Sequence, residues 1–282
     1  MCSNSGMDGA VGEPDPEQLR GLAVRVAQEA AQVAAGFRAG AVSQVRTKSS
    51  ATDPVTEADT ATEELLRRRL AELRPADAVL GEEAGLDADG QGVVPGQLCW
   101  LVDPIDGTVN YLYGLPWYAV SVAVARDGVA LAGAVVEPAS GRVWSASEGG
   151  GASLDGRPLR ASSASRLDLS LIGTGFSYSA ARRARQGMLA GTLLARVRDI
   201  RRAGSASLDL CAVAAGWLDG YYEHAINPWD WAAGALIARE AGAIVSAPDP
   251  AAPYGDAIVA ATPGIHAELA GALVELGGGA IP

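Results

Sequence analysis

Several features that define other classes of protein are missing from this chain of 282 residues. It contains no run of roughly 18 apolar residues, so we expect no transmembrane helix and no membrane partner. Its three cysteines, Cys2, Cys99 and Cys211, are odd in number and far apart, which fits neither a disulfide framework nor a C-x-x-C zinc site. With no secretory signal pattern either, the sequence favours a reducing, cytoplasmic location.

Positive charge is also scarce. The 22 Lys and Arg are outnumbered by 33 Asp and Glu, which gives a formal net charge of −11 and a pI near 4.7. Because phosphate backbones are held by clustered Lys and Arg, we expect no nucleic-acid partner. The densest basic stretches, residues 182–185 and 196–202, are interpreted as solvated helix faces. An anionic ligand must therefore be bound by groups that the fold brings together locally.

The first part of the chain has a mixed α+β pattern. Residues 1–15 are rich in Gly, Ser, Asp and Pro and are expected to form a disordered lead. Apolar residues at helical spacing predict one helix from residue 16 to about 37 and a second at 57–73, where Thr56 and Asp59 resemble a capping box. Short apolar runs at 78–80 and 98–102 predict strands that end in carboxylates.

The pattern changes along the second half. From 118 to 147 it is β, with a hairpin turn at Asp127-Gly128 and a second small hairpin at Asp155-Gly156. After about residue 165 it becomes α/β: Ala-rich helices separate strands near 169–173, 219–223, 243–246 and 257–261. The change predicts two domains, an α+β unit of residues 16–165 and an α/β unit of residues 166–282.

Five acids stand out by their context: Asp59, Glu82, Asp103, Asp106 and Asp230. Glu82 and Asp103 follow predicted strands, and Asp106 lies one tight turn after Asp103. In the segment D-P-I-D-G-T, Pro104 fixes φ and Gly107 permits conformations closed to other residues, so the two carboxylates can converge. Two such charges about 4 Å apart repel by roughly 4 kcal/mol at an effective dielectric constant near 20. The acids must therefore bind a metal ion or take up protons.

A hard cation suits these ligands. Carboxylate and carbonyl oxygens favour Mg²⁺, and zinc is disfavoured because the chain has only two histidines. Gly107 and Thr108 supply backbone N–H groups at the start of an expected helix, where they can donate to a phosphate oxygen. Taken singly, each acid has an ordinary interpretation: D-P-I-D-G-T as an exposed turn, Glu82 as a surface turn, and Asp230 or Asp59 as a charge that opens a helix.

Taken together and in order, the segments resemble the inositol monophosphatase family of the fructose-1,6-bisphosphatase superfamily. The resemblance covers nearly the whole ordered chain and is highly specific. Its segments are K-S-S-A-T-D-P-V-T-E-A-D at 48–59, G-E-E at 81–83, W-L-V-D-P-I-D-G-T-V-N at 100–110, G-S-A-S-L-D-L-C at 204–211, D-G-Y-Y-E at 219–223 and N-P-W-D-W-A-A-G-A at 227–235.

The resemblance implies a layered α/β/α/β/α sandwich and an active site with two or three Mg²⁺. Glu82, Asp103 and the Ile105 carbonyl would hold a first ion, and Asp103, Asp106 and Asp230 a second. Thr108, paired with Asp59, would orient and help to deprotonate a metal-activated water that attacks phosphorus in line. Asp230 would position a water near the leaving alkoxide, and Lys48 lies in a loop that approaches the metals in the family.

The same resemblance implies a small phosphorylated polyol as substrate, with inositol 1-phosphate as the first expectation. The phosphate would contact Gly107 and Thr108, and the substrate hydroxyls would contact Asp106, Ser205, Ala206 and Glu223. An ionised Glu223 suits a polyol because one carboxylate accepts two hydroxyl hydrogen bonds. Family members are commonly homodimers, and we expect a homodimer here.

Three alternatives stay open at this point. The same fold and mechanism could serve adenosine 3′,5′-bisphosphate, histidinol phosphate or fructose 1,6-bisphosphate. A non-catalytic metal-binding interaction protein is a different class, against which the intact acids and Thr108 argue. A haloacid dehalogenase-type phosphatase needs two acids spaced two apart, whereas Asp103 and Asp106 are three apart; a phosphoaspartate trapped at Asp103 would identify that mechanism instead.

Overall fold

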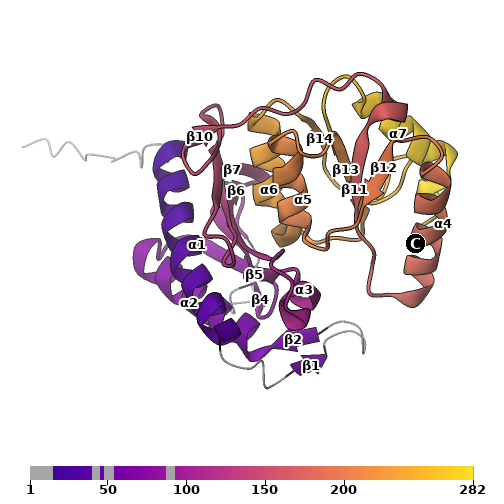
Figure 1. The fold of residues 1–282 in the computed structure, drawn as a ribbon. Coiled ribbons are helices and arrows are strands. Elements are labelled where there is room, and N and C mark those ends of the chain that lie inside the picture. The colour runs from indigo at the N-terminus through magenta and orange to yellow at the C-terminus, as the bar shows by residue number, and fades with distance from the viewer. Residues whose placement is uncertain (1–14, 40–44, 48–53, 87–92, 282) are drawn as a thin grey trace, which may run out of the picture.

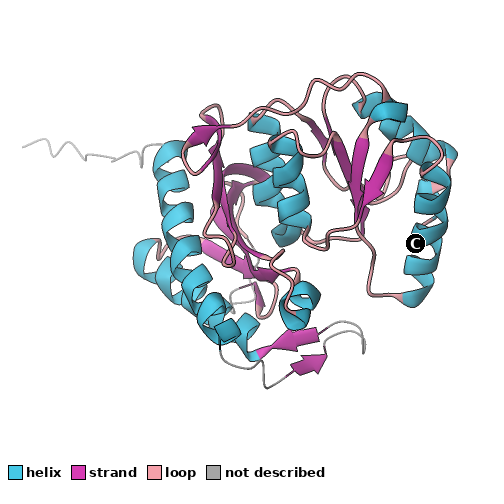
Figure 2. Cartoon of the chain, in the orientation of Figure 1, coloured by secondary structure: helices cyan, strands magenta, loops and turns pink. Residues whose placement is uncertain are grey.

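The fold is a five-layered sandwich of helices and sheets (Figure 1). A computed structural model describes residues 15–39, 45–47, 54–86 and 93–281. The expected lead at 1–15 lies outside these residues except for its last position, and Lys48 also lies outside them. Figure 2 shows the order of the layers: α1 and α2, a large sheet, α5 and α6, a smaller sheet, and then α4 and α7. This is the layered architecture that the family resemblance implies.

The described helices have the following bounds: α1 Pro16–Ala39, α2 Glu57–Leu73, α3 Thr108–Tyr113, α4 Ala180–Leu193, α5 Ala206–Ala214, α6 Pro228–Glu240 and α7 His266–Glu275, with 3₁₀ turns at Leu167–Leu169 and Gly278–Ala280. The first two match the periodicity of the sequence. Thr56 closes the predicted capping box with Asp59 at the start of α2. None of these helices is long and apolar enough to cross a membrane.

Strands β3 to β10 form an eight-stranded sheet in the order β10-β9-β8-β7-β6-β5-β3-β4. Their bounds are β3 Ala78–Gly81, β4 Gly85–Leu86, β5 Leu98–Asp106, β6 Ala119–Arg126, β7 Val129–Val136, β8 Val143–Ser147, β9 Gly151–Leu154 and β10 Arg157–Pro158. Most neighbours are antiparallel, and β3 and β5 are parallel. Their carboxyl ends therefore meet at one edge, where Glu82 and Asp103 lie.

The second large sheet has five strands in the order β12-β11-β13-β15-β14. Their bounds are β11 Leu171–Thr174, β12 Asp199–Arg201, β13 Gly220–His224, β14 Ile244–Ser246 and β15 Ala257–Ala261. A separate two-stranded ribbon pairs β1 Val45–Thr47 with β2 Pro54–Thr56. The predicted hairpins at Asp127-Gly128 and Asp155-Gly156 are confirmed, with left-handed φ angles at both Asp and both Gly positions.

The large sheet is buried on both faces, as β6 shows. Val120, Val122 and Val124 pack into the core beneath α1 and α2. Their neighbours Ala119, Ala123 and Ala125 point the other way, into the core that contains α5 and α6. A strand covered on both faces has no need of polar residues on alternate positions, which explains the nearly continuous apolar run of β6.

Small residues let the middle helices approach their neighbours closely. A Cβ on Gly133 of β7 would lie 3.1 Å from the Cα of Ala233 in α6. A Cβ on Gly234 would lie 2.7 Å from the Cβ of Leu210 in α5. The Ala and Gly content of these segments therefore sets the spacing between α6, the sheet and α5, and with it the position of Asp230.

Two sequence-based expectations about elements were wrong. β5 does not stop at Val102 but continues to Asp106, with a shift of register against β6 between Asp103 and Asp106. The basic stretch at 196–202 does not lie on a helix, because residues 199–201 form β12 beside β11. A strand of three residues is too short to show an alternation of apolar and polar residues, and β12 has a single apolar residue among arginines and an aspartate.

The contact between α5 and α6 predicts a stability effect. Gly234→Ala should lower the free energy of unfolding by about 1–3 kcal/mol, because the added methyl group would lie 2.7 Å from the Leu210 Cβ, closer than van der Waals contact allows. Urea unfolding measures it. Gly187→Ala in α4 is the matched control: nothing lies within 4 Å of its Cβ, so it should stabilise by up to about 1 kcal/mol. Equal effects of the two changes would contradict the packing argument.

Candidate active site

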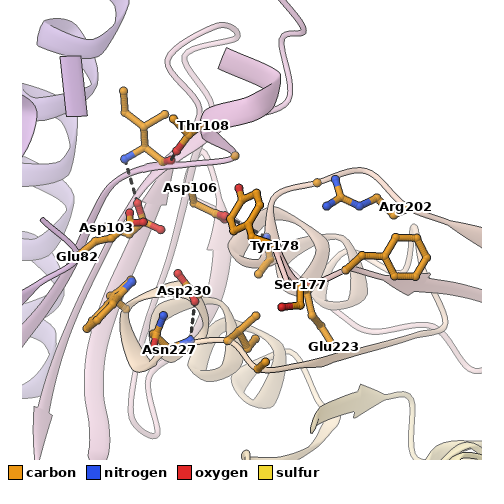
Figure 3. A pocket seen from close by; sticks show the side chains of 18 of the residues that line it. Glu82, Asp103, Asp106, Thr108, Ser177, Tyr178, Arg202, Glu223, Asn227 and Asp230 are labelled. Atoms are coloured by element: carbon orange, nitrogen blue, oxygen red, sulfur yellow. Dashed lines mark hydrogen bonds between the residues drawn. The ribbon is translucent and has the colours of Figure 1, made fainter. Parts of the chain in front are cut away.

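A cavity of about 450 Å³ opens between the edge of the eight-stranded sheet and the segments that precede α5 and α6 (Figure 3). Glu82 and Asp103 enter it from the ends of β3 and β5, and Asp230 enters from the first turn of α6. Gly107 and Thr108 form one wall, and Glu223 from β13 lies at the opposite end. The cavity therefore collects residues from both halves of the chain.

The D-P-I-D-G-T segment reaches the cavity through an irregular strand end. The Ile105 N–H donates to Asp103 Oδ1 at 3.0 Å, within the register shift of β5. Gly107 has φ 97° and precedes the first residue of α3. A Cβ there would lie 3.1 Å from the carbonyl oxygens of Gly204 and Trp117, so glycine is required for both conformation and space.

Asp59 and Thr108 are far apart in sequence and lie together in the structure. The Thr108 hydroxyl lies 3.3 Å from Asp59 Oδ1 and 3.1 Å from the Ile105 carbonyl oxygen. The other oxygen of Asp59 accepts from the N–H and the hydroxyl of Thr56, at 2.8 and 2.5 Å. Asp59 has no solvent exposure. Its second oxygen is thus fixed by the cap of α2, while the first faces Thr108.

Asp106 holds the start of α5. Its carboxylate accepts the Ser205 hydroxyl at 2.6 Å, the Ala206 N–H at 3.2 Å, and both the N–H and the hydroxyl of Ser207 at 2.7 and 2.5 Å. A helix start is a favourable place for a carboxylate because its N–H groups lack intrahelical partners. The donors of Ser205 and Ala206 are therefore directed to Asp106. Ser207 was missed by the sequence analysis.

The acids of the cavity raise one another's proton affinity. Burial raises the pKa of Asp103 well above its usual range, and the charges of nearby acids, Glu82 first, raise it further. Burial and the Glu82 charge also raise the pKa of Asp230 well above its usual range. The N–H of Asn227, which donates to Asp230 at 2.6 Å, opposes this shift. Burial also raises the pKa of Asp106, although its hydrogen bonds oppose the shift.

This electrostatic arrangement fits a hard cation. The donors are oxygen atoms only, and a divalent ion would relieve the repulsion that raises their pKa values. Glu82, Asp103 and the Ile105 carbonyl belong to adjacent strand ends, as the first expected metal set requires. Over the residues that the structure describes, no three His, Cys, Asp or Glu side chains already stand as a complete set of ligands. Two members of the second expected metal set already accept hydrogen bonds: Asp106 from the start of α5, and Asp230 from the N–H of Asn227.

Glu223 defines the far end of the cavity. It accepts the Tyr221 hydroxyl at 2.5 Å, and a Cβ on Gly175 would lie within 2.1 Å of both its carboxylate oxygens. Burial raises its pKa to about 7, against the lowering effects of the Tyr221 hydrogen bond and the Arg202 charge. The Glu223 carboxylate of β13 therefore fits beside the end of β11 because residue 175 has no side chain.

One wall of the cavity was not foreseen. It consists of Phe176 to Ser179, which follow β11, and Arg202, which follows β12. The Arg202 guanidinium lies 5.9 Å from the centre of the Phe176 ring, and within the described chain it forms no ion pair. Only the parallel pairing of β11 and β12 brings these segments together. The one sequence signal was the basic stretch that we had interpreted as a helix face.

The comparisons with known proteins support a phosphatase. Residues 15–277 match the model of the inositol monophosphatase family, so the chain belongs to that family. It is 52% identical to the inositol-1-monophosphatase of Mycobacterium leprae (strain TN), over 95% of this chain and 97% of that protein.

Two further relatives widen the comparison. The solved structure of Mycobacterium tuberculosis SuhB is 46% identical and superposes with a TM-score of 0.81, over 95% of this chain and 100% of that one. The Nus factor SuhB of Pseudomonas aeruginosa (strain PAO1) is 38% identical, over 71% of this chain and 74% of that protein. The relatives thus include proteins named for an enzyme activity and proteins named as Nus factors.

The buried acids predict a separation of activity from stability. Asp103→Asn should lower kcat by at least ~10³, equivalent to about 4 kcal/mol. The metal-free variant should unfold at no lower urea concentration than the wild type, since one of the repelling charges is gone. Asp168→Asn, at an exposed acid paired with Arg166, is the control and should leave both quantities unchanged. Wild-type kcat in Asp103→Asn would overturn the assignment of the site.

Glu223 predicts a pH dependence of stability. Its folded-state pKa of about 7 lies above the ordinary 4.5, so loss of its proton opposes folding. The wild type should therefore lose about 2 kcal/mol relative to Glu223→Gln between pH 5 and pH 8. Urea unfolding in a chelator measures the difference. Glu148→Gln, an exposed control, should track the wild type at both pH values; a pH-independent difference for Glu223→Gln would contradict the raised pKa.

Proposed function

We propose that the chain is a Mg²⁺-dependent phosphomonoesterase that hydrolyses inositol 1-phosphate, or a similar small polyol phosphate, to the alcohol and inorganic phosphate. One observation carries the proposal: a single cavity is lined by four acids at strand and helix ends, by Thr108, whose hydroxyl contacts Asp59, and by the Glu223 carboxylate at its far end. Family membership and the names of the relatives support the phosphatase class.

The metal ligands are proposed from the family resemblance, and the oxygen donors present fit a hard cation. Glu82, Asp103 and the Ile105 carbonyl would hold one Mg²⁺, and Asp103, Asp106 and Asp230 a second. Bound Mg²⁺ lowers the pKa of a coordinated water and neutralises phosphate oxygens. A third ion at Glu82 and a contribution of Lys48 are expectations from the family resemblance.

The chain's own residues orient the reactants. Thr108 can pass a proton toward Asp59 Oδ1, because the hydroxyl already lies 3.3 Å from that oxygen. The backbone N–H groups of Gly107 and Thr108 are proposed to hold phosphate, since they stand at the beginning of α3 and line the cavity. Asp230 is proposed to position a water near the leaving alcohol, from the first turn of α6.

The alcohol is proposed to face Glu223. An ionised Glu223 accepts two hydroxyl hydrogen bonds, and below its pKa of about 7 the protonated form also donates one. Ala206 and Asp106 line the same cavity, and the Ser205 hydroxyl and the Ala206 N–H both donate to Asp106. This arrangement of donors and acceptors suits a ring that carries several hydroxyl groups. A homodimer is proposed from the family resemblance, and a cytoplasmic location from the odd number and wide spacing of the cysteines.

One observation favours a second candidate, a substrate that carries two phosphates. Arg202 is a cation that lines an otherwise acidic cavity, at the wall away from Asp103. Stacking on Phe176 holds the guanidinium but leaves its N–H donors available to an anion. A second phosphate of fructose 1,6-bisphosphate or adenosine 3′,5′-bisphosphate would meet this group. Histidinol phosphate, the third alternative, has no second phosphate to place there.

Substrate choice can be tested by phosphate release, with and without Mg²⁺. The substrates are inositol 1-phosphate, histidinol phosphate, fructose 1,6-bisphosphate and adenosine 3′,5′-bisphosphate. We expect Mg²⁺-dependent release with the highest kcat/KM for inositol 1-phosphate, and less than about 3-fold change in Arg202→Gln, because a polyol monophosphate needs no second cation.

The control is Arg201→Gln, whose side chain pairs with Asp199 outside the cavity. A bisphosphate preference that falls at least ~10-fold in Arg202→Gln but not in Arg201→Gln would replace the polyol by the second candidate. Absence of Mg²⁺-dependent release from all four esters would refute the proposed function and favour the interaction-protein alternative.

A further inference from the structure

Helix α2 holds the turn that carries Glu82. The Glu63 side chain is 2% exposed, and its two oxygens accept the backbone N–H of Glu83 at 2.7 Å and of Ala84 at 3.0 Å. These two amides directly follow Glu82. A carboxylate that accepts two backbone N–H groups forms strong, directional hydrogen bonds, so it fixes the backbone at that point.

Arg67 completes the contact one helical turn later. Its Nε lies 2.8 Å from Glu63 Oε1, and its other nitrogens donate to the carbonyl oxygens of Gly85 and Val79. Glu63 therefore holds the turn through its N–H groups, and Arg67 holds the strands on either side of it through the carbonyl groups of Val79 and Gly85. Because the buried Glu63 carboxylate has a guanidinium partner and two amide donors, its charge is compensated in the interior.

Gly81 provides the space for this contact. A Cβ at residue 81 would lie 2.5 Å from the Cδ of Glu63. The three residues of the G-E-E segment thus have different tasks: Gly81 admits Glu63, Glu82 faces the cavity, and Glu83 supplies an N–H group.

The same helix also reaches the other side of the site. Asp59 lies four residues before Glu63, hence on the same face of α2, and accepts the Thr108 hydroxyl. Both acids are buried. One rigid helix face therefore relates the position of Glu82 to that of Thr108.

We propose that Glu63 is a positioning residue for the Glu82 carboxylate: by fixing the Glu83 and Ala84 amides it keeps Glu82 beside Asp103 and ready to bind a divalent cation. The inference rests on the proposed metal-dependent function. Residues that orient metal ligands without touching the metal typically contribute 10–100-fold to metal affinity or activity. The effect should therefore appear in cation binding before it appears in substrate binding.

The test compares Glu63→Gln with the wild type in two measurements. Calorimetric titration of the substrate-free protein with Mg²⁺ should show an affinity at least ~10-fold lower, while KM for inositol 1-phosphate at saturating Mg²⁺ changes less than about 3-fold. Amide hydrogen exchange without metal should be faster at Glu83 and Ala84. The amides of Gly149 and Gly151, which the Glu240 carboxylate holds in the same manner, are internal references that should not change.

Two further variants keep the test decisive. Glu64→Gln is exposed on the next position of α2 and should behave as the wild type. Gly81→Ala should reproduce the loss of Mg²⁺ affinity with Glu63 intact, because its methyl group displaces that carboxylate. Wild-type Mg²⁺ affinity in folded Glu63→Gln or in folded Gly81→Ala would refute the proposal.

The two proposals fail in different ways. Faster exchange at Glu83 and Ala84 with Mg²⁺ affinity unchanged would mean that Glu63 serves the backbone alone, which overturns the inference and leaves the proposed function standing. If the wild type itself neither bound Mg²⁺ nor released phosphate, the proposed function would fall and the inference with it.

Discussion

The hydrogen bonds between Asp106 and the start of α5 join the two halves of the molecule. Asp106 ends the strand that carries Asp103, and α5 lies between the two large sheets. Because the carboxylate accepts both N–H and hydroxyl groups, it fixes the helix axially and laterally. The cavity walls lie on either side of this contact between Asp106 and α5. The shape of the cavity therefore depends on these hydrogen bonds.

Close packing around that joint explains the composition of the middle layer. Gly133 allows β7 to approach Ala233 of α6 closely, and Gly234 allows α6 to approach α5. A thin layer places the first turn of α6, and so Asp230, near the ends of β3 and β5. Burial of several acids at one point is unfavourable for the metal-free chain, as the raised pKa values of Asp103 and Asp230 show. The surrounding apolar cores supply the stability that offsets this cost.

Local features of the chain were predictable because their causes are local. The capping box of Thr56 and Asp59 fixed the beginning of α2, and the Asp127-Gly128 turn fixed a hairpin. The short strand β12 was missed, since three residues with two charged ends have no readable alternation. The end of β5 was misplaced because register against β6 is a tertiary property. Arg202 was assigned to a helix face because the pairing of β12 with β11, which places it at the cavity, is also a tertiary property.

The sequence by itself determined the types of donor available: carboxylate oxygens after strands, a glycine that opens α3, and too few histidines for a nitrogen-based site. Ordered motifs also determined the family. Only the tertiary structure decided which atoms these donors meet: Asp59 with Thr108, Asp106 with α5, Glu63 with the amides that follow Glu82, and Arg202 with the cavity. Residues 49 to 101 positions apart come into contact in the first two cases, and no pattern of neighbours along a chain encodes such distances.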